Sequence, residues 1–72
     1  MASLCERIID LQASSGALKK DVAKAVDVSV MAYYRYETGD RYPPLPTLIA
    51  LADYFGVSLD YLVGRSDNPE MR

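Results

Sequence analysis

Residues 18–41 read LKKDVAKAVDVSVMAYYRYETGDR, and this stretch predicts two short helices joined by a tight turn. The first segment, Lys19–Val26, is about two turns long and carries its apolar residues on one face. Asp27-Val28 separates it from the segment Ser29–Glu37, which opens on a serine, a favourable helix N-cap. Gly39 then suits the left-handed conformation in which many helices end.

Two short helices joined by a turn of about three residues cross at a steep angle, so the second helix protrudes. A protruding helix fits the major groove of DNA, where its side chains reach the base edges. The N-terminus of the first helix presents free N–H groups and a helix dipole to the phosphate backbone. The stretch therefore predicts a DNA-binding surface.

The second segment divides into two faces at about 3.6 residues per turn. One face carries Tyr33, Tyr36 and Glu37, and we assign it to the core because two tyrosines supply the bulk that a small domain needs. The opposite face carries the candidate base-contacting residues, which are Val30, Met31, Tyr34 and Arg35.

These four side chains offer different contacts to DNA. The guanidinium of Arg35 suits guanine or phosphate, Val30 and Met31 would contact thymine methyl groups, and Tyr34 would stack or hydrogen-bond to a phosphate. Two other interpretations stay open. In the first, Arg35 is an ordinary solvated residue on the helix surface and does not contact DNA. In the second, Val30 and Met31 form an interface with another protein, because exposed apolar residues on a helix also make protein interfaces.

Upstream, apolar residues recur at helical spacing at Leu4, Ile8 and Leu11. Arg7 and other polar residues between them complete an amphipathic helix. Ser3 and Glu6 match a capping box at its start, and residues 14–16 (Ser-Ser-Gly) end it.

Downstream, residues 41–44 must be extended, because each proline restricts the residue before it. Pro46 suits the first turn of a fourth helix that ends at Gly56, and Ser58 caps a fifth that ends at Gly64. The fold class is therefore all-α, a compact bundle of five short helices. The apolar residues of the fifth helix close the core, form a dimer seam or do both, since one short helix has two faces, and they are Leu59, Tyr61, Leu62 and Val63.

The 72 residues allow one domain, which we place at residues 1–66, followed by a polar tail at 67–72 whose chain we expect to be frayed from residue 65 on. A single cysteine, Cys5, and no histidine exclude a zinc site, an internal disulfide and histidine-based catalysis. With no glycine-rich phosphate loop either, we expect no enzyme, cofactor, metal or small-molecule ligand. Apolar runs are too short for a membrane span and no signal peptide is visible, which predicts the cytoplasm.

The net charge of −2 argues against nucleic-acid binding, because DNA-binding domains usually carry a basic surplus. The distribution of charged residues along the chain weakens this argument against nucleic-acid binding. Between residues 16 and 42, five lysines and arginines stand against four acidic residues, whereas the last thirty residues hold two arginines against four acidic residues. The predicted DNA-binding stretch is thus mildly basic.

These features together resemble the lambda-repressor-like, Cro/cI-type (XRE) helix-turn-helix domains, from about Leu4 to Asp67. The matching stretches are Asp21–Val26, Val28-Ser29, Tyr36–Arg41 and, most specifically, Leu48–Asp67. The resemblance implies a five-helix domain that binds palindromic operators as a homodimer. It places Val30, Met31 and Arg35 at base-reading positions and Tyr34 at a variable position beside them.

The resemblance also implies a set of phosphate contacts, with which we group Lys20: Lys19, Lys20, Ser29 and Arg41. Lys19 stands where the family usually has a glutamine. Leu18 replaces the usual polar cap of the second helix. Gln12 replaces an arginine that often pairs with the glutamate at the position of Glu37, so Glu37 needs another partner.

We therefore predict a sequence-specific transcriptional regulator, a repressor of phage or mobile-element type, with double-stranded operator DNA as its partner. The main alternative is a protein-binding module, an antirepressor or antitoxin, that kept the fold without strong DNA binding. A second alternative is that the chain is part of a longer regulator.

Overall fold

The computed structural model describes residues 3–70, which form five α-helices and no strand. The helices are α1 (Leu4–Ser15), α2 (Lys19–Ala25), α3 (Val30–Thr38), α4 (Leu45–Phe55) and α5 (Leu59–Leu62). The predicted all-α, five-helix fold is confirmed. The first two residues of the predicted domain and the last two of the predicted tail lie outside the described residues.

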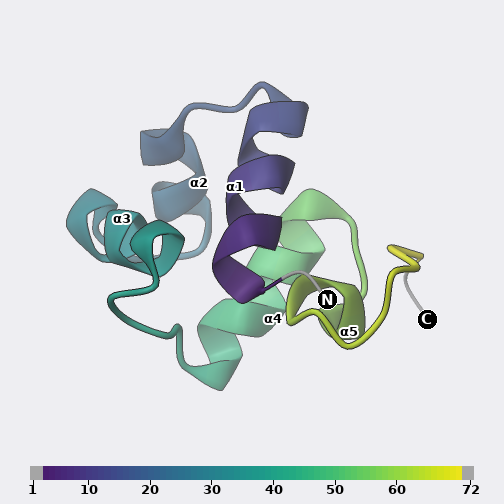
Figure 1. The fold of residues 1–72 in the computed structure, drawn as a ribbon. Coiled ribbons are helices and arrows are strands. Elements are labelled where there is room, and N and C mark those ends of the chain that lie inside the picture. Colours follow the sequence, from purple (N-terminus) through teal and green to yellow (C-terminus); the bar gives the residue numbers. More distant parts are fainter. Residues whose placement is uncertain (1–2, 71–72) are drawn as a thin grey trace.

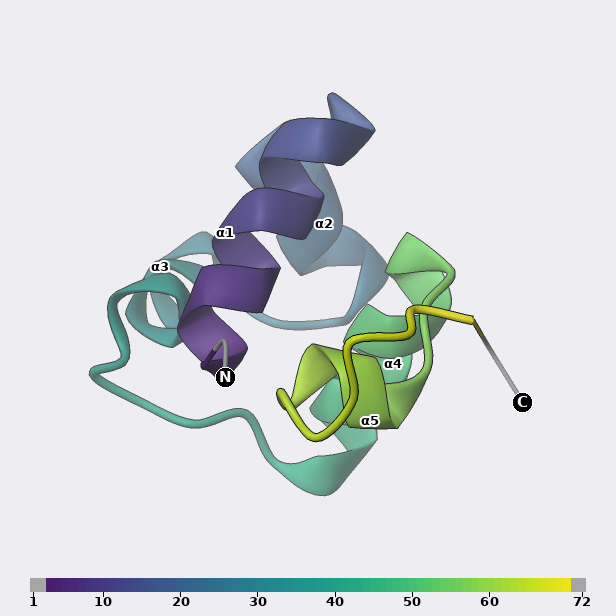
Figure 2. The same ribbon diagram turned by 45° about the vertical axis from the view of Figure 1, so that its right-hand side comes forward.

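Helix α1 lies at the centre of the arrangement, with α3 on one side and α5 on the other (Figure 1 and Figure 2). Each of the five helices contributes one of the largest fully buried side chains of the shared core, and these are Ile8, Val22, Tyr33, Leu51 and Leu62. Burying a side chain of this size stabilises the fold by about 1.5–3 kcal/mol. No helix of this 72-residue chain can therefore be removed without exposing part of the core.

Local signals place the helix ends where the sequence predicts them. The Ser3 hydroxyl accepts the backbone N–H of Glu6, whose carboxylate accepts the N–H of Ser3, so the capping box is confirmed. The Ser29 hydroxyl caps α3 by accepting the N–H of Ala32 at 3.0 Å. Gly39 ends α3 at φ 80°, a left-handed conformation that glycine adopts without steric cost.

One polar residue of the amphipathic α1 is not on the solvent side. Arg7 is buried, and its guanidinium carbon lies 3.7 Å from the centre of the Tyr61 ring. It also donates a 2.9 Å hydrogen bond to the exposed carboxylate of Asp67. Arginine tolerates this position because its long stem and planar head pack on an aromatic ring while one edge reaches a carboxylate.

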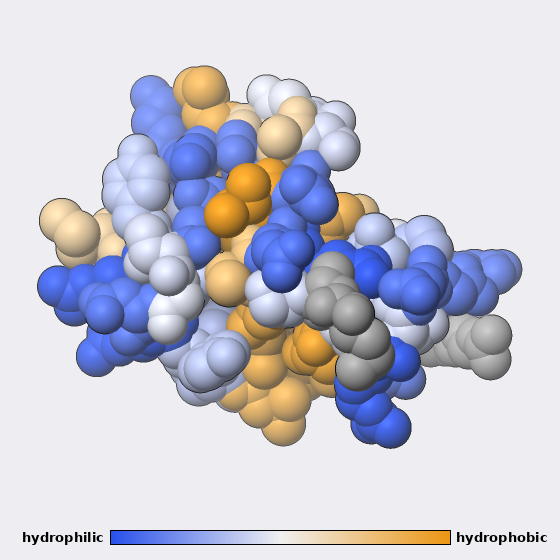
Figure 3. All heavy atoms as spheres, in the orientation of Figure 1, coloured by the Kyte–Doolittle hydropathy of each residue, from blue (hydrophilic) through white to orange (hydrophobic). Residues whose placement is uncertain are grey.

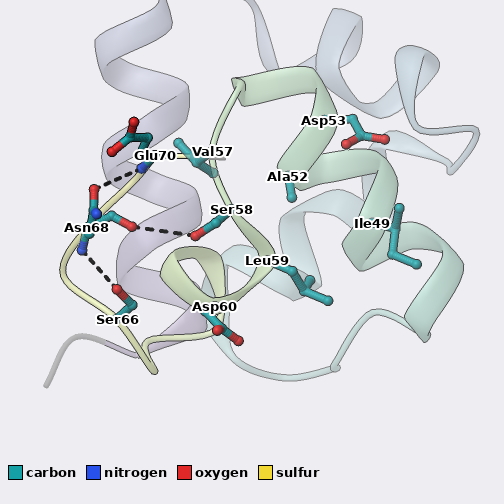
Figure 4. Close-up of a pocket in the computed structure, with 10 residues that line it drawn as sticks. All are labelled: Ile49, Ala52, Asp53, Val57, Ser58, Leu59, Asp60, Ser66, Asn68 and Glu70. Atoms are coloured by element: carbon teal, nitrogen blue, oxygen red, sulfur yellow. Dashed lines mark hydrogen bonds between the residues drawn. The ribbon is translucent and has the colours of Figure 1, made fainter. Parts of the chain in front are cut away.

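The expectation of a frayed tail is wrong for residues 65–70. The backbone N–H of Ser58 donates to the carbonyl of Pro69 at 3.0 Å, and its hydroxyl lies 3.5 Å from the carbonyl of Asn68 (Figure 4). Together with the Arg7–Asp67 pair, these bonds hold the segment against α5 and the start of α1. Among the helices of residues 3–70, none is long and apolar enough to cross a membrane.

Candidate nucleic-acid interface

A tight turn sets the angle between α2 and α3. Asp27 adopts a positive φ of 62°, and its N–H donates to the carbonyl of Lys24. The N–H of Val28 then donates to the carbonyl of Ala23 at 2.9 Å, which closes the turn over the end of α2. The sequence shows a polar residue at this position but not its left-handed backbone, which aspartate tolerates better than most residues.

The two faces of α3 are as predicted. Tyr33, Tyr36 and Glu37 are buried, which confirms the assignment of the tyrosines to the core. The four candidate base-contacting residues on the other face, Val30, Met31, Tyr34 and Arg35, are exposed. The outer face of α3 is thus available to a partner, and its contact with DNA bases stays a prediction.

Lys19, the first residue of α2, does not extend freely into solvent. Its Nζ lies 2.7 Å from Oε1 of Glu37 and 5.4 Å from the centre of the Tyr34 ring. The hydrogen bond to Glu37, with a further contribution from its charge, raises the pKa of the Lys19 ammonium despite partial burial. Glu37 therefore has a partner other than the arginine that the family resemblance implied.

The glutamine that replaces that arginine has a local role. Gln12 donates its side-chain N–H to the carbonyl of Ala17 at 2.7 Å, between α1 and α2. This bond gives the Ala17 carbonyl a hydrogen-bond donor two residues before α2 begins. Leu18, which follows, makes no side-chain cap bond to α2, as its apolar side chain predicts.

The other predicted phosphate contacts lie at exposed positions. Lys20, Ser29 and Arg41 are exposed. Lys20, Arg41 and the predicted base-contacting Arg35 form no ion pair with any residue between 3 and 70, so their charges face solvent. The N–H of Arg41 donates to the carbonyl of Arg35 at 3.3 Å, which ties the loop after α3 to the end of that helix. The structure therefore brings α2, α3 and this loop together through backbone and side-chain contacts.

Sequence reasoning missed two features of this surface. One is the contact of Lys19 with Glu37 and Tyr34, which joins residues 15 and 18 positions apart. The other is Tyr42, which follows Arg41 and is the most exposed of the large apolar side chains in residues 3–70. A tyrosine next to two prolines could have indicated it, because an extended loop has little core to bury a ring in.

A family model described as Helix-turn-helix matches residues 18–62, more than half of the chain. The chain belongs to the helix-turn-helix family. Among relatives with this motif, YobD of Bacillus subtilis, named as an uncharacterized transcriptional regulator, is 30% identical over 66 residues, which are 92% of this chain and 59% of YobD. RstR of Vibrio cholerae, a cryptic phage CTXphi transcriptional repressor, is 28% identical and matches 83% of this chain and 54% of its own. The helix-turn-helix chain thus spans less than two thirds of the length of these relatives.

Solved structures show the same helix-turn-helix arrangement. The P22 c2 repressor, determined in complex with a synthetic operator, superposes with a TM-score of 0.85 at 26% identity, over 92% of this chain and 100% of that one. A transcriptional regulator from Listeria innocua gives 0.82 at 31% identity, over 86% of this chain and 58% of that one. The resemblance to lambda-repressor-like domains is thereby confirmed.

Proposed function

We propose that this helix-turn-helix chain is a sequence-specific DNA-binding transcriptional regulator that acts as a repressor. The observation that carries the proposal is the exposed outer face of α3, in a fold that superposes on a repressor solved with its operator. It acts without catalysis and in the cytoplasm, where the DNA is. The boundary between a DNA-binding domain at 1–66 and a tail at 67–72 is part of the same proposal.

In this proposal α3 enters the major groove and reads the sequence, while neighbouring groups fix its register on the phosphates. Arg35 is the strongest reader, because its fork can donate two hydrogen bonds to guanine and no carboxylate of residues 3–70 pairs with it. Val30 and Met31 contact thymine methyl groups, and Tyr34 lies beside them. Lys20, Ser29 and Arg41 make the phosphate contacts expected of them. The phosphate contact expected of Lys19 is not part of this proposal, because the Lys19 ammonium pairs with Glu37.

The operator is palindromic and the regulator a homodimer, with one α3 in each of two half-sites about one helical turn apart. Of the two roles considered for α5, core closure suits its residues better, because Leu62 is fully buried and Tyr61 packs under Arg7. We place the dimer surface on a neighbouring apolar strip of the α3–α4 loop and α4, made of Tyr42, Leu45 and Ile49. Apolar side chains gather over α4 in the space-filling view (Figure 3).

Selection of bound duplexes from a random library, followed by titration of the enriched duplex, tests the proposal. Arg35→Ala should weaken binding by about 1–3 kcal/mol, the usual value of a bidentate base contact. Lys24→Ala is the matched control, because it removes an exposed cation at the far end of α2, outside the proposed contacts. Equal binding by Arg35→Ala and the parent would remove Arg35 from the readers.

The protein-binding alternative is favoured by one observation, the exposure of Val30 and Met31 on a chain of net charge −2. An interface with another protein would use these apolar groups and would not need basic ones. If the selection enriches no duplex and random duplexes are not shifted below micromolar protein, this alternative replaces the DNA-binding proposal.

A further inference from the structure

The ion pair between Lys19 and Glu37 joins the outer surface of the helix-turn-helix to its core. The Glu37 side chain is only 7% exposed, whereas that of Lys19 is 38% exposed. The 2.7 Å distance between Nζ and Oε1 is that of a short, charge-assisted hydrogen bond. A buried carboxylate on α3 thus holds a lysine that begins α2.

The surroundings of Glu37 make this lysine hard to replace. Its second oxygen, Oε2, is buried and has no hydrogen-bond partner in residues 3–70, and the same is true of the Tyr33 hydroxyl. No other cation of those residues pairs with Glu37. A buried carboxylate that loses its cation is strongly destabilised, so the native structure keeps Lys19 in place.

The same contact orders a second side chain on the outer surface. The Lys19 ammonium lies 5.4 Å from the ring centre of Tyr34, within the range of a cation–π interaction. Tyr34 is exposed and belongs to the outer face of α3. A chain of contacts therefore runs from Glu37 in the core through Lys19 to Tyr34 at the surface.

We propose that Glu37 is a positioning residue for DNA binding: it holds Lys19 between α2 and α3, and Lys19 in turn holds the Tyr34 ring in the orientation that the DNA meets. In this arrangement Lys19 adds positive potential but stays with Glu37 instead of extending to a phosphate. The inference rests on the proposed function, since it concerns how that same surface is prepared.

The substitution Glu37→Gln separates positioning from simple electrostatics. It removes a negative charge near DNA, so electrostatics alone predicts tighter binding. Positioning predicts the opposite, a loss of about 3- to 30-fold in affinity for the selected duplex, which lies within the range expected for coupled neighbouring side chains. Asp40→Asn is the matched control, because it removes the same charge from an exposed position after α3 and should leave binding unchanged or tighter.

A readout without DNA tests the contact itself. The Lys19 side-chain methylene protons near the Tyr34 ring should show upfield NMR shifts that disappear in Glu37→Gln and persist in Asp40→Asn. In thermal unfolding, Lys19→Met should lower the midpoint, and the double variant Lys19→Met/Glu37→Gln should recover most of the loss, since it leaves no unpaired buried charge.

Duplex binding and the Lys19 NMR shifts together distinguish a failure of the positioning role of Glu37 from a failure of DNA binding. Binding by Glu37→Gln that equals or exceeds that of the parent would overturn the positioning role, and so would unchanged Lys19 shifts. A parent that binds no duplex, but whose Lys19 shifts collapse in Glu37→Gln, would overturn DNA binding and leave the contact standing as a feature of the fold alone.

Discussion

The Tyr33 side chain is fully buried in the core, but its hydroxyl has no hydrogen-bond partner in residues 3–70. Burial, and after it the negative charge of Glu37, raises the pKa of this phenol well above its ordinary value of 10.0. Lys19, which pairs with the same carboxylate, also has a raised pKa, chiefly through its hydrogen bond to Glu37. Two neighbouring groups therefore hold their protons more tightly in the folded state than in the unfolded chain.

These shifts predict a loss of stability at alkaline pH. Above about pH 10 the unfolded chain releases protons that the folded state retains, so the free energy of unfolding falls as pH rises. Tyr33→Phe removes one of the two groups and should make the decline shallower. Urea titrations between pH 8 and 11 measure this, with the exposed Tyr42→Phe as control. An equal decline in Tyr33→Phe and the parent would contradict the assignment.

The burial of Arg7 leads us to expect a loss of stability when this side chain is removed. Arg7→Ala removes the packing on Tyr61 and the bond to Asp67 together, and it should lower the free energy of unfolding by about 1–3 kcal/mol. Asp67→Asn removes only the exposed partner and should cost less than about 1 kcal/mol. Urea unfolding at neutral pH compares the two. A loss in Asp67→Asn as large as that in Arg7→Ala would mean that the ion pair, and not the packing, stabilises this contact.

At the scale of elements, the sequence predicts what depends on neighbours along the chain. Helix caps and helix ends depend on residues only three or four positions apart, so the local sequence predicts them. Examples are the caps at Ser3 and Ser29 and the helix end at Gly39. The environments of Arg7 and Lys19 depend on partners from other helices, 60 and 18 positions away in their ion pairs. Periodicity cannot supply such partners, and for that reason it indicated a polar side for Arg7. The family resemblance likewise implied a phosphate contact for Lys19 and gave no sign of its partner Glu37.

The start of α2 is one of two helix starts in residues 3–70 without a side-chain cap bond, the other being that of α4. Leu18 has the extended backbone of an N-cap, at φ −74° and ψ 146°, but its side chain makes no cap bond and is 58% exposed. Leu18→Ser should therefore stabilise the domain by about 0.5–1 kcal/mol without any change of backbone. Leu18→Ala is the control, because it removes the leucine and adds no hydroxyl. Thermal unfolding decides: a serine variant no more stable than the alanine variant would show that the first turn gains nothing from a cap.

At the scale of the whole molecule, the apolar strip of Tyr42, Leu45 and Ile49 needs an explanation that the monomer does not give. Tyr42 lies in the loop between α3 and α4, directly after the proposed phosphate contact Arg41, and Leu45 and Ile49 lie four residues apart on α4. A strip in this place would join two copies with their α3 helices facing the same way, as a palindromic operator demands. The small net charge of −2 repels a second copy only weakly, so it allows a second copy to cover the strip.

A variant with polar residues in the strip tests this arrangement without changing the charge. Leu45→Gln/Ile49→Gln should raise the protein concentration needed for operator binding by about tenfold or more, because dimer assembly loses buried apolar contacts. Its thermal midpoint at low concentration should stay near that of the parent, since both side chains are exposed in the monomer. Ile9→Gln on α1 is the matched control, with an exposed fraction of 44% against 45% for Ile49. Sedimentation of the parent as a monomer at every concentration, with binding to isolated half-sites as tight as to the palindrome, would contradict the dimer and leave the strip to some other partner.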